Sequence, residues 1–375
     1  MDYKKYNNTK LFLKITQASL SFVLLLSFVI LGYSKDLEVY LKSTVGTPIL
    51  VFLTFVIITG ILFSLILFPL NFYSGFILEH KYNLSNQSLR KWILEMIKGS
   101  LVGTLISVPV LLFFYFSLHQ FKSLWWLPFA IFIFIFSVIL ARIVPVFILP
   151  IFYKIIPLNN PELTDRIFQL AVGSKLNIEN IYEFDMSKNT KKANAAFTGI
   201  GKSRRIILGD TLLSCFSINE ILTVIAHEIG HFERKHIIKN IVLSTFLCFF
   251  SLYIIAFTYN ISLPIFNFVD ITELAALPLL ILIAALISLI TTPLSNYFSR
   301  KFEYEADEYA VTKTRSPDDY SITLMKLTEQ NLGDKNPHPF VEWFWYSHPS
   351  INKRILHIKS IAANNKILFL SGESI

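Results

Sequence analysis

Two histidines and one glutamate stand close together in the stretch AHEIGH, residues 226–231. His227 and His231 are four residues apart, so a helix places both imidazoles on one face, close enough to bind one metal ion. Neutral imidazoles suit zinc, and Glu228 lies where it can take a proton from water that the metal activates. The spacing H-E-x-x-H therefore predicts one Zn²⁺ per chain and hydrolytic chemistry.

A catalytic zinc site usually has three protein ligands and an open position. No third histidine follows at the spacing used by metzincins, so a carboxylate on another helix is the remaining option. The richest acidic cluster on a predicted helix is in the stretch FEYEADE. Glu303 and Asp307 are four residues apart and share a face, so they can serve as a ligand and its hydrogen-bonding partner. Glu305 and Glu308 lie on other faces of this helix.

The elements that must position these residues are apolar. The chain of 375 residues is 53% hydrophobic and 16% charged, and it contains 35 phenylalanines. Six apolar runs are each close to the ~20 residues that a helix needs to cross a bilayer, which predicts an integral membrane protein. The first run is followed by no A-x-A site and is expected to be a retained span. The runs are residues 12–31, 48–70, 99–118, 126–149, 241–259 and 275–294.

His236 is off the histidine face and precedes the fifth run, so we expect it at the level of the lipid headgroups.

The distribution of positive charge predicts the topology. The formal net charge is +8, yet with the N-terminus inside, the outer loops 32–47, 119–125 and 260–274 hold only three of the 34 Lys and Arg residues. The positive-inside rule therefore places both termini and the polar segments 151–235 and 298–375 in the cytosol. The basicity follows from topology, and no nucleic-acid partner is expected.

The runs divide the chain into two parts. Residues 1–150 hold four runs and form an N-terminal membrane block. Residues 151–375 hold a polar insert, the last two runs and a cytosolic tail. The expected fold class is an all-α polytopic membrane protein with about six transmembrane helices and a small cytosolic α/β insert. Residues 71–98, between the second and third runs, are expected to form a helix–turn–helix with Glu79 at the water boundary.

The insert has the pattern of a small α/β unit. Residues 161–176 begin with proline and acidic residues, which suit a helix start. Residues 177–185, 194–200 and 204–210 are short, β-prone and separated by Gly, Asn and Lys, so they are expected to form strands. Helical spacing then returns, and its Ser–x–x–Glu pattern at Ser217 predicts a capping box before the H-E-x-x-H helix.

Several stretches together resemble the integral-membrane zinc proteases of the CAAX prenyl protease type 1 group, peptidase family M48. They are NAAFTG, RRIILGDTLL, VIAHEIGHFERKHIIKNI, SRKFEYEAD, WYSHPSINKRI and, in the first half, FILEHKYNLSNQSL. The resemblance implies an M48 peptidase domain in residues 151–375, with Glu303 as third ligand and Asp307 as its partner. It also implies spans that enclose a large water-filled chamber. The best-known members have seven spans, whereas this chain has six and is expected to lack the first.

The resemblance also implies roles for three further residues. Asn194 is implied to face the substrate, on an edge strand that pairs with the peptide backbone. His348 is implied to lie near the zinc, where it can donate a hydrogen bond to the developing oxyanion. Arg354 can hold a substrate carboxylate or brace the metal ligands.

The expected function is a zinc endopeptidase that removes the C-terminal tripeptide of a prenylated CAAX protein. Its partners are a lipidated or membrane-embedded peptide and membrane lipid; the sequence indicates no oligomeric state. The expected location is the inner membrane of a bacterium or the endoplasmic reticulum of a eukaryote. One alternative is membrane-protein quality control, as in the heat-shock M48 proteases. Another is a transporter or scaffold with a structural zinc, which would more often have four protein ligands and no free glutamate beside them.

Overall fold

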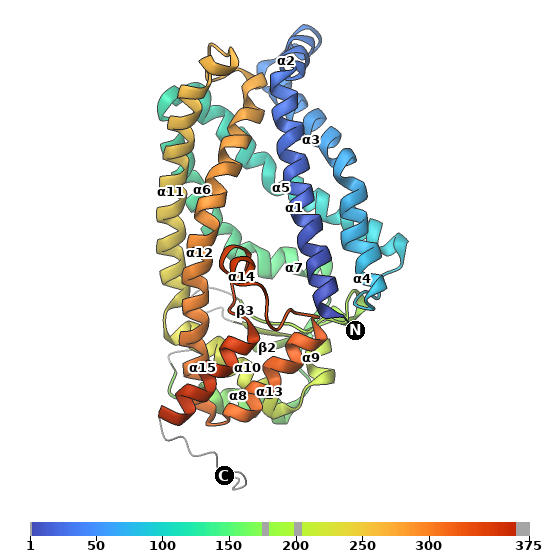
Figure 1. Cartoon of the computed structure of the whole chain (residues 1–375), viewed down its shortest axis with the longest axis vertical. Coiled ribbons are helices and arrows are strands. Elements are labelled where there is room, and N and C mark those ends of the chain that lie inside the picture. The colour runs from blue at the N-terminus through green and yellow to red at the C-terminus, as the bar shows by residue number, and fades with distance from the viewer. Residues whose placement is uncertain (1, 175–179, 199–204, 365–375) are drawn as a thin grey trace.

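The computed structural model describes residues 2–174, 180–198 and 205–364. Long helices run side by side along the long axis of the molecule, and short helices and a sheet gather at one end (Figure 1). Six helical segments are long and apolar enough to cross a membrane, which confirms the expected polytopic α-helical fold. The main helices of these spans are α1 (Tyr3–Ile30), α3 (Pro48–Phe72), α5 (Leu89–Phe121), α6 (Trp126–Ile143), α11 (His236–Ser262) and α12 (Leu277–Thr314).

Two spans continue through π-helical turns. Helix α3 passes through η1 (Tyr73–Ile77) into α4 (Leu78–Lys81), and α5 begins after a short turn. The expected helix–turn–helix of residues 71–98 is therefore made from the ends of two spans. Helix α6 likewise continues through η3 (Val144–Ile148) into α7 (Leu149–Phe152). Pro145 lies in this second turn and lacks the N–H of a regular helix, which favours such a local change of pitch.

The end of the bundle far from the sheet is closed by packed side chains. Helix α2 (Tyr33–Thr44) lies there (Figure 1), and its buried Glu38 accepts a hydrogen bond from the Ala275 amide at 2.8 Å. Lys42 pairs with the other oxygen of this carboxylate at 2.7 Å. These partners offset the cost of burying the charge. Trp125 is fully buried in the apolar cluster beside them, so this end of the bundle is a packed cap.

The sheet has four strands in the order β1-β2-β4-β3. Strands β2 and β4 are parallel, and both β1 and β3 join antiparallel at the edges. Three of the strands were expected; residues 177–179, 199–200 and 204 of those predictions lie outside the described residues. The bounds are β1 (Ile155–Pro157), β2 (Asn180–Phe184), β3 (Ala195–Thr198) and β4 (Arg205–Gly209). Strand β1 was missed because it has only three residues and ends in proline.

A polar cluster joins the membrane block to the segment before β3. The Glu79 carboxylate on α4 lies 2.5 Å from Lys10 of α1 and 3.0 Å from Lys192, and it accepts a hydrogen bond from the Tyr6 hydroxyl. The side chain is only 13% exposed. Glu79 thus links two membrane helices to the start of the edge strand, which explains an acidic residue next to a span.

Short helices complete the soluble end around the sheet. Helix α8 (Pro161–Ala171) packs against α10 (Ile218–Glu233), with Leu163 and Ile167 fully buried in an apolar cluster that also includes residues of β2 and β4. The remaining helices are α9 (Asp210–Cys215), α13 (Pro317–Gln330), α14 (Pro339–Trp345) and α15 (Ile351–Asn364).

Helix α10 carries the H-E-x-x-H motif. It opens with the expected capping box, in which Ser217 and Glu220 exchange side-chain and backbone hydrogen bonds. It ends at Glu233, and Lys235 takes a left-handed conformation with φ of 57° before α11 begins. The motif and the following span are therefore two helices that meet at an angle, because a left-handed residue ends the α-helical path.

Helices α10 and α12 approach each other closely at Gly230. A Cβ at this position would lie 3.0 Å from the Cβ of Tyr309 and 3.1 Å from the Cα and carbonyl oxygen of Ala306. Ala226 and Ala310 are also fully buried here. Small residues let two helix backbones come together, so these positions set the separation of the histidine helix from α12.

On its membrane side α12 also contains Pro293, which removes one backbone hydrogen bond.

Substituting Gly230 with alanine is expected to push α10 away from α12. Because the obstructing atoms are backbone and Cβ atoms, they cannot move aside as a flexible side chain would. We expect a loss of about 1–3 kcal/mol of stability, measured as a lower melting temperature in detergent, together with weaker metal binding. Gly103→Ala is the matched control, since nothing lies within 4 Å of the Cβ it would add on α5. Equal melting temperatures for the two variants would contradict the close-contact assignment.

Candidate metal centre

The structure brings the three expected metal ligands together. The Nε2 atoms of His227 and His231 are 3.1 Å apart, and each lies 3.3 Å from an oxygen of Glu303. One ligand atom from each residue lies within 4.8 Å of the others. The histidines come from α10 and the glutamate from α12, so the close approach of these two helices forms the site.

The donor atoms fit a divalent cation. Both Nε2 atoms converge on Glu303, whose side chain is 6% exposed. Its Oε2 atom is buried and makes no hydrogen bond to any residue that the structure describes. Its nearest partners are Nε2 of His227 and Nη1 of Arg354, each 3.3 Å away, and a metal ion would supply a closer one. Two imidazoles and a carboxylate form the ligand set of a catalytic zinc site.

His227 is held from its other nitrogen. Its Nδ1 lies 3.0 Å from Oδ1 of Asp307 and 2.8 Å from the hydroxyl of Tyr320. Burial alone lowers the pKa of His227, but the Glu303 and Asp307 carboxylates outweigh it and raise the pKa to about 9. Burial and Asp307 raise the pKa of Tyr320 well above its ordinary value, so its hydroxyl stays protonated. These contacts direct Nε2 toward the metal site, as outer partners of a ligand histidine do.

Arg354 supports the same group of residues from α15. Its guanidinium donates from Nε to Asp307 Oδ2 at 2.9 Å and lies 3.3 Å from Glu303. Burial lowers the pKa of Arg354, but Asp307 and Tyr320 raise it well above the ordinary value. Of the two roles considered for Arg354, the geometry favours bracing the metal ligands. The residue is buried, and its guanidinium contacts Asp307, Glu303 and Tyr320.

His231 is backed by a second histidine. Its Nδ1 lies 2.9 Å from Nδ1 of His236, whose Nε2 lies 3.0 Å from Glu305. His236 is 1% exposed and contacts His231, so the expectation that it lies off the histidine face was wrong; its level relative to the lipid headgroups stays a prediction. That expectation assumed one continuous helix, whereas the left-handed Lys235 turns the chain so that His236 comes back under the site. Glu305 lies on another face of α12 than Glu303, as expected, but that face meets α11.

The proposed proton carrier has no partner in the described part of the chain. Glu228 is half-buried beside His227, and no hydrogen bond or ion pair engages its carboxylate there. His348 reaches the site from the segment after α14, with Nε2 3.3 Å from Glu303 and 62% of its side chain exposed. The Glu228 carboxylate is therefore available to a substrate, and the exposed His348 ring is accessible to one.

Asn194 is exposed and directly precedes β3, the edge strand. Its carbonyl accepts a hydrogen bond from the Gly209 amide at 3.0 Å. The Asn331 side chain bonds both the amide and the carbonyl of the preceding Ala193. Strand β3 also packs against α10. The edge where a peptide backbone could pair is thus anchored at its start and lies next to the metal helix.

Sequence reasoning missed two outer partners of the histidines. Tyr320 lies 93 residues after His227, and no spacing signal links them. The pair of His236 and Glu305 is separated by 69 residues and by the apolar parts of two spans. The buried polar character of these residues is visible only after α10, α11, α12 and α13 pack together.

Metal affinity separates the ligand from the outer partner on α12. Glu303→Ala is expected to lose most bound zinc, since only two ligands remain. Glu305→Ala is expected to retain zinc with roughly 10- to 100-fold weaker affinity, because His231 loses its support. Competition with a chelator of known affinity measures both. Glu308→Ala is the matched control, because the Glu308 carboxylate pairs with exposed Arg234 at 3.6 Å and with no metal-site residue in the described part of the chain. The same affinity for Glu305→Ala and Glu308→Ala would show that the His236 contact does not support the metal.

Comparisons with known proteins cover both parts of the chain. Residues 157–362 match the description "Peptidase family M48". Residues 2–154 match "CAAX prenyl protease N-terminal, five membrane helices". Four of the six candidate spans and the shorter helix α2 lie in this second range.

Similar proteins come from bacteria and from fungi. An uncharacterized metalloprotease, YhfN, of Bacillus subtilis is 31% identical over 94% of this chain and 84% of its own length. CAAX prenyl protease 1 of Saccharomyces cerevisiae is 32% identical over 81% of this chain and 71% of its own length. The crystal structure of S. mikatae Ste24p superposes with a TM-score of 0.79 at 27% identity, covering 95% of this chain and 88% of that one. The chain therefore belongs to peptidase family M48 and carries the N-terminal membrane domain of the CAAX prenyl proteases.

Proposed function

We propose that this membrane metallopeptidase uses zinc to remove the C-terminal tripeptide of prenylated CAAX-type proteins. The observation that carries the proposal is the ligand set His227, His231 and Glu303 with the unpaired Glu228 beside it. The relatives named CAAX prenyl protease 1, including those of Saccharomyces cerevisiae and Homo sapiens, support the substrate class. A lipidated peptide suits an enzyme whose metal helix continues into a span.

The residues divide the work of peptide hydrolysis. Zinc held by the three ligands would polarise the scissile carbonyl and lower the pKa of the attacking water. Glu228 takes a proton from that water and delivers it to the leaving amine. His348 donates a hydrogen bond to the oxygen on which negative charge develops. The β3 edge, beginning at Asn194, holds the peptide in an extended conformation through backbone hydrogen bonds.

A second candidate function is removal of damaged membrane proteins without a need for prenylation. The similarity to a bacterial metalloprotease over 94% of the chain favours it, because prenylated CAAX proteins are not expected in bacteria. The third alternative, a transporter or scaffold with a structural zinc, fits less well. A structural site is usually closed by four protein ligands, whereas three ligands and a free glutamate meet here.

Two substitutions test the assigned chemistry. Glu228→Gln is expected to bind zinc and peptide normally while kcat falls steeply, since the amide cannot accept the proton.

His348→Ala is expected to lower kcat and kcat/KM by the same factor, roughly 10²–10³, with KM nearly unchanged. Steady-state kinetics on farnesylated and unmodified versions of one CAAX peptide measures both. Cleavage restricted to the farnesylated peptide supports the CAAX assignment, and equal cleavage favours the quality-control candidate. A rise in KM alone for His348→Ala would make it a binding residue.

We also propose that both termini and the peptidase end lie in the cytosol. Three features support this orientation: the Lys and Arg asymmetry, the N-terminus next to the peptidase end, and α2 at the opposite end (Figure 1). The water-filled chamber implied by the family would then open toward the cytosolic peptidase end, since packed side chains close the other end.

Cysteine labelling tests the orientation with an internal reference. Cys215 is free and exposed at the peptidase end, and Asp36→Cys adds an exposed thiol on α2. In sealed vesicles of known orientation, a membrane-impermeant maleimide is expected to label Cys215 from the cytosolic side and the introduced cysteine from the other side. Both chains carry Cys248→Ser, which removes the second free cysteine, and the chain without Asp36→Cys supplies the control for Cys215 alone. Labelling of both positions from one side would contradict the six-span topology.

A further inference from the structure

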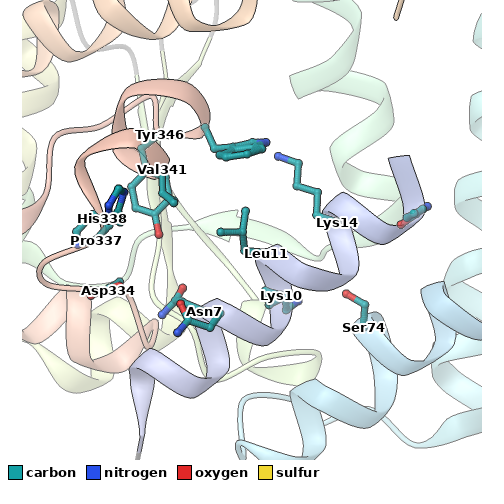
Figure 2. Close-up of a pocket in the computed structure, with 13 residues that line it drawn as sticks. Asn7, Lys10, Leu11, Lys14, Ser74, Asp334, Pro337, His338, Val341 and Tyr346 are labelled. Atoms are coloured by element: carbon teal, nitrogen blue, oxygen red, sulfur yellow. The ribbon is translucent and has the colours of Figure 1, made fainter. Parts of the chain in front are cut away.

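A cavity of about 400 Å³ lies between α1, the turn after α3 and the segment that carries α14 (Figure 2). Lys10 and Lys14 of α1 contribute positive charge to its lining. Leu11, Val341 and Trp345 contribute apolar surface. The cavity thus combines cationic and apolar walls, which suits a ligand that is apolar along its length and anionic at one end.

Lys14 is the unusual member of this lining. It lies within the first candidate span, roughly 16 Å along α1 at 1.5 Å per residue. Its side chain is exposed, and its ammonium group makes no hydrogen bond or ion pair with any residue that the structure describes. Lys10 differs, because it pairs with Glu79 at 2.5 Å. A charged residue within a span that faces a cavity indicates a ligand pathway.

The acidic group of the cavity does not neutralise Lys14. Asp334 also lines the cavity, but Figure 2 shows it well apart from Lys14, with Leu11 between them in the view. Its Oδ1 accepts a hydrogen bond from the Asn336 amide. The Lys14 end of the cavity is therefore its cationic end.

The cavity adjoins the metal centre. Tyr346 in its wall is two residues from His348, so their Cα atoms are at most about 7 Å apart, and His348 reaches Glu303 at 3.3 Å. Arg300, one turn before Glu303 on α12, donates to the Tyr346 carbonyl at 2.7 Å and fixes this wall. An extended tripeptide spans about 10 Å, so one that begins at the scissile bond can reach into the cavity.

We infer that this cavity binds the last residues of the peptide substrate, with Lys14 pairing with the free C-terminal carboxylate. The inference rests on the proposed function and names the group that the substrate must carry. Arg354, the other cation considered for this carboxylate, is buried and occupied by Asp307 and Glu303. The apolar walls suit the aliphatic residues that precede the C-terminus of a CAAX sequence. A free carboxylate near Lys14 thus distinguishes a chain end from an internal peptide bond.

The experiment compares two peptides that differ only in a free or amidated C-terminus. The protein is purified in nanodiscs of neutral phosphatidylcholine, as the wild type, Lys14→Gln and Lys4→Gln. Lys4 is exposed on the same helix, as Lys14 is, but it does not line the cavity, so it is the matched control. Loss of one charge-assisted hydrogen bond corresponds to roughly a 10- to 100-fold change. Lys14→Gln is expected to lower kcat/KM for the free acid by this factor, to the level of the amide, and to leave the amide unchanged.

A binding measurement keeps the inference testable without turnover. In the Glu228→Gln background, the free-acid tripeptide is expected to bind roughly 10- to 100-fold more weakly when Lys14 is also changed to Gln. If the wild type cleaves neither peptide but this loss is observed, the proposed function fails and the binding site stands. Equal effects of Lys14→Gln on acid and amide overturn the inference. The inference is also overturned if Lys14→Gln weakens the binding of phosphatidylglycerol, added to the nanodisc lipid, and leaves tripeptide binding unchanged. That result would assign the cavity to a lipid headgroup.

Discussion

The separation between α10 and α12 is the constraint on which the metal centre depends. Two ligands lie on one helix and the third on the other, and their donor atoms meet only because Gly230 rests against Ala306. A methyl group there would occupy space already taken by backbone atoms. The glycine inside H-E-I-G-H and the alanine inside E-Y-E-A-D thus have a packing role. Helix α12 needs its small residue at Ala306, between the ligand Glu303 and the brace Asp307.

Charge balance is the second constraint, because the centre is buried. Asp307 and Glu303 bring two carboxylates into a region of low dielectric, and Arg354 alone does not neutralise both. Breaking a buried ion pair by removing one member typically costs about 3–5 kcal/mol. The arginine therefore supports the folded arrangement of α12, α13 and α15 as well as the ligands. The two carboxylates also raise the pKa of His227, so either a proton on His227 or a cation bound at its Nε2 balances the second negative charge.

The sequence predicted the elements with strong periodic or compositional signals. The six spans, the helix starting after Ser217 and three of the four strands are of this kind, because each depends on local apolar spacing or capping. The convergence of His227, His231 and Glu303 was also foreseeable, since metal chemistry demands a third ligand. His236 was misplaced because a single left-handed residue, Lys235, redirects the chain. A glycine at this position would have indicated the end of the helix, but the residue is a lysine. Tyr320 and Lys14 depend on contacts between distant segments, which no local pattern records.

The two sides of the metal centre have different attachments to the bilayer. Helix α10 ends before the membrane begins, whereas α12 runs without interruption from the far cap to Thr314, a length of roughly 57 Å. A change in bilayer thickness would alter the tilt of α12 through hydrophobic mismatch, and an unbroken rod would carry that tilt to Glu303. Pro293 removes one backbone hydrogen bond between the two ends of this rod, so bending is easiest there. The lower part of α12 can therefore stay clamped against α10 while its upper part follows the lipid. A bend at Pro293 would reduce how strongly the ligand geometry follows the thickness of the surrounding membrane.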